Sequence, residues 1–326
     1  MAEKFIRVRL TRIDNLDLNL FDFDHDTTFV VFFMDAKENV YARYGGRDSH
    51  DAENRQSLPG LKYTMASVLA MHKRERKDFA PKAHDESKYH SDYPGGMRRG
   101  CMHCHQVKEA MNSSLRRSGQ WSRDKAWRFP LPENLGFTLE VDRGNVIEKV
   151  APSTPAARIG LQSGDVVQRL NSVPIHSFGD AQFALDRAPV SGAFAMSWRR
   201  GDRLFEEKIS LLDGWRKTDI LWRASMRHQT GSLRVFGTDL SADERKALGL
   251  SPKQLAFRQW DSLSGQAKKA GVRAGDIILG LDDLKLEMDV NGFRRYVEGH
   301  YLIGDRVALN IIRDGKRMNL ELTLGR

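Results

Sequence analysis

Residues 157–170 read ARIGLQSGDVVQRL, and residues 268–281 read KKAGVRAGDIILGL, 111 positions further along the 326-residue chain. Two glycines, an aspartate and a leucine recur at the same spacing: Gly160, Gly164, Asp165 and Leu170 match Gly271, Gly275, Asp276 and Leu281. The glycines permit left-handed turns after a short helix, and the aspartate can bond to the main chain where a buried strand begins. The wide separation indicates a duplicated domain, because solenoid units are much shorter.

A second pair of matching segments supports this duplication. Residues 200–211 read RGDRLFEEKISL, and residues 313–324 read RDGKRMNLELTL. Each predicts a turn followed by a strand with alternating side chains. The C-terminal two thirds of the chain therefore predict two related domains of mixed helix and strand.

The repeated stretch resembles the PDZ fold of bacterial periplasmic proteases of the HtrA/DegP type. In that family S-P-A-A-x-A-G-L-x-x-G-D precedes a strand, and residues 153–161 here read STPAARIGL. The resemblance covers about residues 130–213 and 232–326. It implies an α+β, multidomain chain in which residues 128–216 and 217–326 form two PDZ domains, each a partly open β-barrel with helices.

PDZ domains bind peptide or protein C-termini by adding a strand to a sheet edge. The family holds the terminal carboxylate with main-chain N–H groups of an apolar-Gly-apolar loop, and a helix at residues 180–187 is expected to flank the groove. The resemblance therefore implies that the peptide-binding residues of the first PDZ domain are Leu135, Gly136, Phe137, Leu139, Ala181 and Leu185.

The second domain departs from the family in this loop. Its expected peptide-binding residues are Leu233, Val235 and Phe236, but Arg234 stands where the family prefers glycine. Glycine allows a close approach of the backbone that a residue with a Cβ atom hinders. We therefore expect carboxylate-dependent binding in the first PDZ domain, and weaker binding that is indifferent to the carboxylate in the second.

A serine protease domain normally accompanies such PDZ domains. The chain has no G-x-S-x-G motif, and the roughly 130 residues before the first PDZ domain are too few for a double-barrel protease domain. No acid–base pair or catalytic triad is visible either. The sequence therefore assigns no enzymatic reaction to this chain.

Residues 1–80 resemble the second half of a thioredoxin-like fold. Residues 29–48, FVVFFMDAKENVYARYGGRD, predict two strands joined by a turn; residues 58–72 have helical periodicity, and residues 4–10 alternate as a further strand. The thioredoxin redox motif is missing. The whole chain resembles bacterial thioredoxin-like/PDZ proteins, some of which carry selenocysteine at that motif, which implies that Met1 is a false start after an in-frame UGA codon.

Both cysteines lie in GCMHCHQV at residues 100–107, within a predicted loop and helix segment at residues 81–127. C-x-x-C-H is the pattern of covalent c-type haem attachment, and residues 106–115 predict the helix that follows such a motif. A haem c needs two thioether links, a proximal histidine and an opposite axial ligand. The candidate residues are Cys101, Cys104 and His105, with Met97, His90 or His84 as the opposite ligand.

Three other interpretations of this motif stay open. The two cysteines and two nearby histidines could bind zinc, and neighbouring methionines would suit Cu(I). The pair could also act as a dithiol or disulfide, or be purely structural. The candidate metal ligands are Cys101, Cys104, His103, His105 and His84, with Met97 and Met102 for copper.

Charge and hydropathy bear on partners and location. The net charge is +9, but acidic residues are interleaved with the basic ones and no nucleic-acid-binding motif is present, so we do not expect a nucleic-acid partner. No apolar run approaches the length of a membrane span, and residues 1–10 do not form a signal peptide. The cysteine pair indicates a periplasmic or other extracytoplasmic setting for the full-length protein.

Together these features predict an extracytoplasmic redox or electron-transfer protein, with a c-type haem at CMHCH and two PDZ domains that hold a partner. Its redox partner is unknown. The alternative is a non-catalytic PDZ scaffold that binds peptides and in which CMHCH is a disulfide, dithiol or metal clip.

Overall fold

The computed structural model describes residues 1–11, 13, 16–75, 87–89, 92, 104–263 and 265–325. They belong to two compact units, Met1–Thr218 (unit 1) and Asp219–Arg326 (unit 2). Unit 1 contains the N-terminal segment and the first repeat, and unit 2 contains the second repeat. Each repeat has an apolar core of its own.

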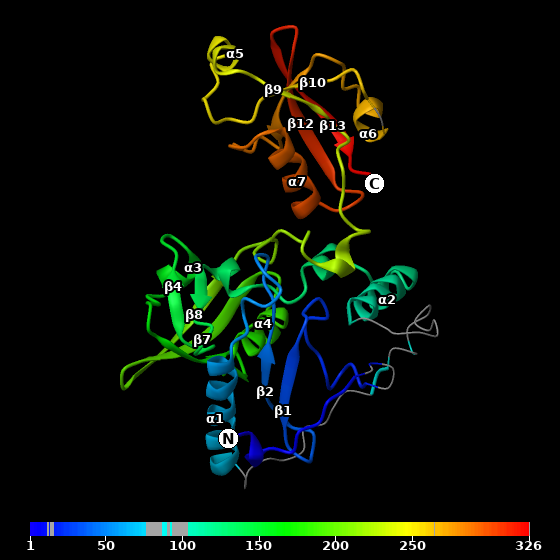
Figure 1. Cartoon of the computed structure of the whole chain (residues 1–326). Helices are drawn as coiled ribbons and strands as arrows, with labels where there is room; N and C mark the ends of the chain where they lie inside the picture. The colour runs from blue at the N-terminus through cyan, green and yellow to red at the C-terminus, as the bar shows by residue number, and fades with distance from the viewer. Residues whose placement is uncertain are drawn as a thin grey trace. The chain divides into compact units, whose positions relative to one another are not determined.

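The N-terminal part of unit 1 is a β-hairpin with one helix beside it (Figure 1). Strands β1 (Val30–Met34) and β2 (Val40–Gly45) pair antiparallel around a turn closed by the Asp35 carboxylate. Helix α1 (Leu58–Glu75) packs on β2. The apolar side chains that they bury together are Phe33, Tyr41, Ala42, Tyr44, Val68 and Met71. This order of elements confirms the strand, turn, strand and helix predicted for residues 29–72.

Two further predicted elements differ in outcome. Residues 6–10 have no sheet partner among the described residues, and Ile6, Val8 and Leu10 are exposed, so the strand predicted at residues 4–10 is wrong. Alternation of side chains needs a neighbouring strand before it forms a sheet. The helix predicted after the cysteine motif is confirmed as α2 (Cys104–Arg117).

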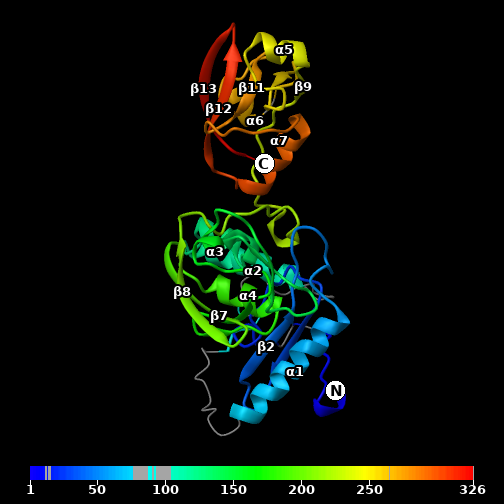
Figure 2. The same ribbon diagram turned by 90° about the vertical axis from the view of Figure 1, so that its left-hand side faces the viewer.

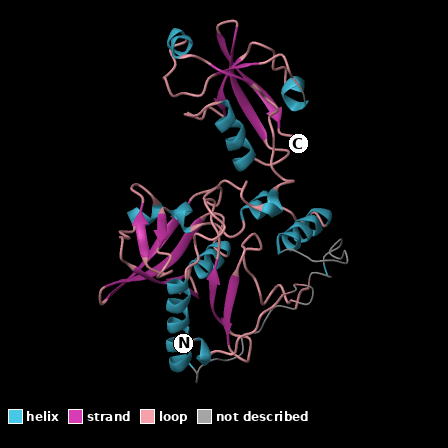
Figure 3. Ribbon diagram, in the orientation of Figure 1, coloured by secondary structure: helices cyan, strands magenta, loops and turns pink. Residues whose placement is uncertain are grey.

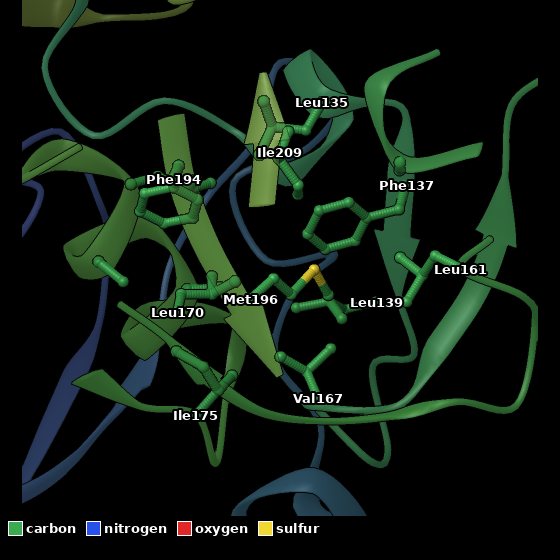
Figure 4. Close-up of a cluster of buried hydrophobic side chains, with 14 of the residues drawn as sticks. Leu135, Phe137, Leu139, Leu161, Val167, Leu170, Ile175, Phe194, Met196 and Ile209 are labelled. Carbon is green, nitrogen blue, oxygen red and sulfur yellow. The ribbon is translucent and has the colours of Figure 1, made fainter. Parts of the chain in front are cut away.

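The first repeat forms two small sheets around one core. Its strands are β3 (Phe137–Leu139), β4 (Ile147–Val150), β5 (Val166–Leu170), β6 (Val173–Pro174), β7 (Gly192–Arg200) and β8 (Arg203–Leu211). One sheet pairs β3 with β4, and the other has the order β6-β5-β7-β8. Helices α3 (Pro155–Arg158) and α4 (Phe178–Asp186) complete the repeat. Figure 4 shows Phe137 and Leu139 from β3 facing Met196 from β7 across the core.

The second repeat forms one open sheet with three helices around it (Figures 2 and 3). The strands, in the order β13-β12-β11-β10-β9, are β13 (Lys316–Thr323), β12 (Arg306–Arg313), β11 (Ile277–Leu281), β10 (Phe257–Gln259) and β9 (Gly237–Asp239). The helices are α5 (Ala242–Ala247), α6 (Gly265–Lys269) and α7 (Val290–His300). Helix α7 contributes Phe293 and Val297 to the core.

The repeated aspartate holds the same ion pair in both units. Asp165 and Asp276 are 1% and 2% exposed. Arg200 binds Asp165 through two nitrogen atoms at 2.7 and 2.8 Å, and Arg313 binds Asp276 at 2.8 and 2.7 Å. Two parallel N–H···O bonds fix the geometry of such a pair. The two matching segments of each repeat therefore recur together, because the arginine that opens the second segment neutralises the buried aspartate of the first.

The predicted barrels are wrong in form. The strands make open sheets of two, four and five strands, and a single bridge, Val146 to Val166, links the two sheets of the first repeat. The hairpin and α1 do not by themselves establish the thioredoxin-like fold predicted for residues 1–80. None of the helices in the described ranges is long and apolar enough to cross a membrane.

Candidate functional site

The loop expected to hold a carboxylate in unit 1 is built around Gly136. The short helix η4 (Pro132–Leu135) ends at this residue, which has a φ of 92°. A Cβ atom at Gly136 would lie 2.2 Å from the side chain of Thr154. Glycine is therefore required here both by the left-handed backbone and by the close approach of Thr154.

Strand β3 leaves one edge facing away from β4. On the β4 side, the carbonyl of Gly136 accepts from the N–H of Ala151 at 2.8 Å, and the N–H of Glu140 donates to the carbonyl of Val146 at 2.9 Å; these two partners flank β4. Main-chain groups alternate in direction along an antiparallel strand, so those of Phe137 and Leu139 point the other way. These are the groups with which an added peptide strand would pair.

Helix α4 forms the other wall of this groove. Ser177 caps it by accepting from the N–H of Asp180 at 3.2 Å. The predicted groove residues Ala181 and Leu185 are fully buried in the core beneath the helix. The carboxylate of Asp180 is buried as well, and burial raises the pKa of Asp180 to about 7.

The N-terminal part of unit 1 packs directly on α4. The main-chain N–H of Arg43 donates to the Asp180 carboxylate at 2.7 Å, and Gln182 donates to the carbonyl of Arg47 at 3.5 Å. A Cβ atom at Gly46 would lie 2.6 Å from the ring of Phe178. Residues 43–47 therefore lie against the first half of α4.

Arg55 reaches both walls of the groove. Its Nη1 donates to the carbonyl of Leu139 on β3 at 3.3 Å, and its guanidinium lies 4.9 Å from the ring centroid of Phe178 on α4. Nη2 pairs with the carboxylate of Glu133, and Nε pairs with Asp48 at 2.7 Å. Burial raises the pKa of Glu133 despite the positive charge of Arg55. Arg55 thus occupies an acceptor on the edge that a peptide would use.

The corresponding loop of unit 2 keeps the left-handed backbone without a glycine. Arg234 has a φ of 55° and is exposed, while Leu233 and Val235 on either side are buried. Gly265 lies opposite, and a Cβ atom placed on it would be 3.9 Å from the Cβ of Arg234. The structure therefore accommodates the arginine without crowding from the facing residue.

Strand β9 lies at the edge of its sheet. The carbonyl of Phe236 accepts from Trp260 at 2.9 Å, and the N–H of Leu240 donates to Ala256 at 3.0 Å, on either side of β10. By alternation the main-chain groups of Gly237 and Asp239 point away from β10. No described residue bonds to those outward groups. The ring of Phe236 is half-buried beneath the Arg294 guanidinium of α7, 4.5 Å from its centroid.

Several of these residues were not predicted from the sequence. Arg55 and Glu133 lie 78 residues apart in unit 1, and nothing in their local patterns indicates that they meet. Arg294 lies on α7, and no groove helix was predicted from the sequence for the second domain. The predicted loop residues Leu135 to Phe137, and Leu139, lie on η4, Gly136 and β3 as expected from the motif.

The cysteine motif lies mostly outside the described residues. Cys104 and His105 open α2. The other predicted haem and metal ligands lie outside the described residues, namely Cys101, Met97, Met102, His103, His90 and His84. Burial raises the pKa of the Cys104 thiol, and His105 lies 3.1 Å from Glu109. Within the described residues no three His, Cys, Asp or Glu side chains gather as a metal site. Binding of haem, zinc or copper by this motif stays a prediction.

Comparison with protein families identifies the two repeats. One PDZ domain model matches residues 146–200, and a second PDZ domain model matches residues 263–324. Both matches fall on the repeats that contain the glycine turn and the buried aspartate.

Three curated proteins illustrate the similarity. The chain is 32% identical to the periplasmic serine endoprotease DegP of Escherichia coli K12 over 94 residues, which are 29% of this chain and 19% of DegP. It is 35% identical to the periplasmic pH-dependent serine endoprotease DegQ of the same strain over 94 residues, 29% of this chain and 20% of DegQ. A probable DegP-like endoprotease of Marinomonas sp. MWYL1 is 25% identical over 219 residues, 65% of this chain and 45% of that protein. The chain thus spans less than half the length of each relative.

Among solved structures, the HtrA-type protease AlgW with a decapeptide matches with a TM-score of 0.26 and 20% identity, covering 32% of this chain and 33% of that one. This similarity is too low to support a conclusion of its own.

The relatives overturn the predicted function. They are periplasmic serine endoproteases with PDZ domains, so the predicted redox or electron-transfer protein with haem at CMHCH is wrong. A disulfide, dithiol or metal clip at that motif stays a prediction. The similarity concerns the peptide-binding repeats instead. The chain carries two PDZ domains in tandem, one in each unit.

Proposed function

We propose that this chain recognises extended peptides, including protein C-termini, through the grooves of its two PDZ domains. PDZ domains bind such peptides by main-chain pairing along a sheet edge, with side-chain pockets for selectivity. The observation that carries the proposal is the outer edge of β9, where the main-chain groups of Gly237 and Asp239 point away from the sheet without a partner among the described residues.

Unit 1 contributes a second groove with a different chemistry. Gly136 gives its loop the backbone with which a PDZ domain holds a terminal carboxylate, and the N–H groups of Phe137 and Leu139 face the groove. We expect this domain to depend on a free carboxylate more strongly than unit 2.

Two finer features belong to the same proposal. The relatives are periplasmic proteins, which supports an extracytoplasmic setting for this chain. The β1–β2 hairpin followed by α1 supports a thioredoxin-like N-terminal fold ahead of the PDZ pair.

The test is a titration of the full chain with a fluorescein-labelled octapeptide pool that ends in free Val, Leu or Phe. We expect saturable binding with a Kd of about micromolar strength. Replacing Asp239 by proline removes an outward N–H and should weaken binding about tenfold or more, because the peptide strand loses a main-chain donor. The Asp239 carboxylate also accepts from the N–H of Val290 on α7 at 3.1 Å. Asp239→Ala is therefore the matched control, since it loses the same carboxylate but keeps the outward N–H and should bind like the wild type.

Circular dichroism of the variants checks that unit 2 remains folded. Titration with an amidated peptide pool shows whether a loop binds the terminal carboxylate. At a loop that does, we expect the affinity to fall about tenfold. If the wild type shows no saturable binding, or Asp239→Pro binds as tightly as Asp239→Ala, the proposal is wrong.

A further inference from the structure

We propose that residues 43–57, here called the cover segment, close the peptide groove of the first PDZ domain, and that Arg55 is the residue that holds this cover in place. The inference rests on the proposed function, because it concerns access to one of the two grooves. It makes unit 1 a binding site that a partner must open, whereas unit 2 is open as folded.

The cover segment contacts both walls of the groove. On the helix side, Arg43 bonds to the Asp180 carboxylate at 2.7 Å, and Gly46 lies so close to Phe178 that a Cβ atom would be 2.6 Å from its ring. On the strand side, Ser57 donates to the carboxylate of Asp142, just beyond β3, at 2.6 Å. The segment therefore lies against α4 at one end and beside the β3 strand at the other.

Arg55 joins the two sides within a single side chain. Its bond to the carbonyl of Leu139 takes an outward acceptor of β3, and its face covers Phe178 at the start of α4. A peptide strand pairing with β3 needs that same carbonyl. The guanidinium and a bound peptide therefore exclude each other at this position.

Two carboxylates hold the guanidinium in this position. Asp48, only 2% exposed, accepts from Arg55 at 2.7 Å and is itself fixed by the N–H of His50 and the amide of Asn54, each at 2.8 Å. Burial alone would raise the pKa of Asp48, but these hydrogen bonds lower it below its ordinary value, so the carboxylate is charged at neutral pH. Glu133, on η4, pairs with the other side of the guanidinium.

The second PDZ domain lacks this arrangement. On the outer edge of β9 the main-chain groups of Gly237 and Asp239 have no partner among the described residues, and Arg294 lies over Phe236 of the loop instead of bonding to the strand. The comparison indicates that closure of the first groove comes from the cover segment and is not built into the PDZ fold.

The test compares Arg55→Gln with Arg143→Gln in the full chain. Arg143 pairs with Glu140 beside β3 on the surface at 2.6 Å, so its variant makes the same charge change next to the same strand without touching the cover. Each protein is titrated with the free-carboxylate octapeptide pool, and hydrogen exchange measures peptide-induced protection of residues 137–140 and, separately, of residues 237–239. Exchange in β7 and β8 reports whether unit 1 remains folded.

We expect Arg55→Gln to bind the pool at β3 about tenfold more tightly than the wild type, because two ion pairs and a main-chain bond no longer compete with the peptide. Arg143→Gln should equal the wild type. Without peptide, residues 139–142 should exchange faster in Arg55→Gln.

Two results would contradict the proposal that the cover segment closes the groove. One is equal protection of β3 in the wild type and Arg55→Gln, and the other is no protection of β3 in Arg55→Gln. Protection of β9 in the same samples reports the proposed function independently. A protein that binds at β9 but shows no Arg55 effect therefore refutes the cover alone, and one that binds at neither strand refutes the function as well.

Discussion

The carboxylate loops of the two PDZ domains share a left-handed backbone but differ in how closely the facing residue packs on them. In unit 1 the carboxylate loop has Gly136 and faces Thr154; in unit 2 the loop has Arg234 and faces Gly265. Both loop residues have a positive φ, 92° and 55°. Only the unit 1 pair is crowded: a Cβ atom on Gly136 would lie 2.2 Å from Thr154, whereas a Cβ atom on Gly265 would be no nearer than 3.4 Å to the Arg234 side chain. The loop glycine is therefore required by packing in unit 1, and the corresponding position in unit 2 accepts an arginine.

The largest effect expected from this comparison is that of Gly136→Ala. The new Cβ would meet the Thr154 side chain at 2.2 Å on a left-handed backbone, so we expect unit 1 to lose about 3 kcal/mol of unfolding free energy. Gly160→Ala is the matched control: its φ of 78° is similar, but nothing lies within 4 Å of the added atom, so only about 1 kcal/mol should be lost.

Hydrogen exchange of β7 and β8 measures the stability of unit 1 for both variants. The double variant Gly136→Ala/Thr154→Gly should regain part of the lost unfolding free energy, because the clash is removed. The gain should be reduced by about 1 kcal/mol, because Thr154 also caps α3. Equal losses in Gly136→Ala and Gly160→Ala would show that the facing pair does not matter.

A smaller effect, alike in both units, is expected from the repeated ion pair. Asp165→Ala and Asp276→Ala each leave an arginine without its bidentate partner and should destabilise their own unit by about 2 kcal/mol. This loss of unfolding free energy is smaller than that for a fully buried ion pair, because the side chains of Arg200 and Arg313 are 37% and 16% exposed. Exchange in β7–β8 and β12–β13 measures the two losses. A large loss in one unit with none in the other would contradict the structural equivalence of the repeats.

The smallest effect is expected from Arg234→Gly. It removes the strain of a left-handed arginine in a loop where the facing residue is already glycine, so unit 2 should gain about 1 kcal/mol or less. Thermal denaturation, followed by hydrogen exchange in β12–β13, shows whether unit 2 gains or loses stability. A clear loss of stability would show that the Arg234 side chain contributes contacts that outweigh its backbone strain.

The features that could be predicted from the sequence are those encoded in short, continuous segments. The glycine turn, the aspartate and the alternating strand lie within short segments, so the duplicated domains, the β1–β2 hairpin and helices α1, α2 and α4 could be predicted from such segments, whereas α5, α7 and strands such as β7 and β12 were not. The strand at residues 4–10 failed because alternation does not supply a partner strand, and the barrels failed because sheet closure depends on contacts between distant strands.

The candidate site shows the same limit. The loop at Gly136 and the helix α4 follow from the motif, but Arg55 meets Glu133 and Leu139 across 78 and 84 residues, which no local pattern encodes. The cysteine motif misled the functional prediction in a different way, since a specific short pattern was given more weight than the two repeated domains.

The central claim is that the second groove is open and the first is covered, and hydrogen exchange of the unaltered chain tests it most directly. The chain is mixed with the free-carboxylate octapeptide pool at the lowest concentration that saturates β9, and exchange is compared with and without peptide at residues 237–239 and 137–139. The account predicts clear protection of β9 and little or none of β3. Protection of β3 equal to or greater than that of β9 would contradict it.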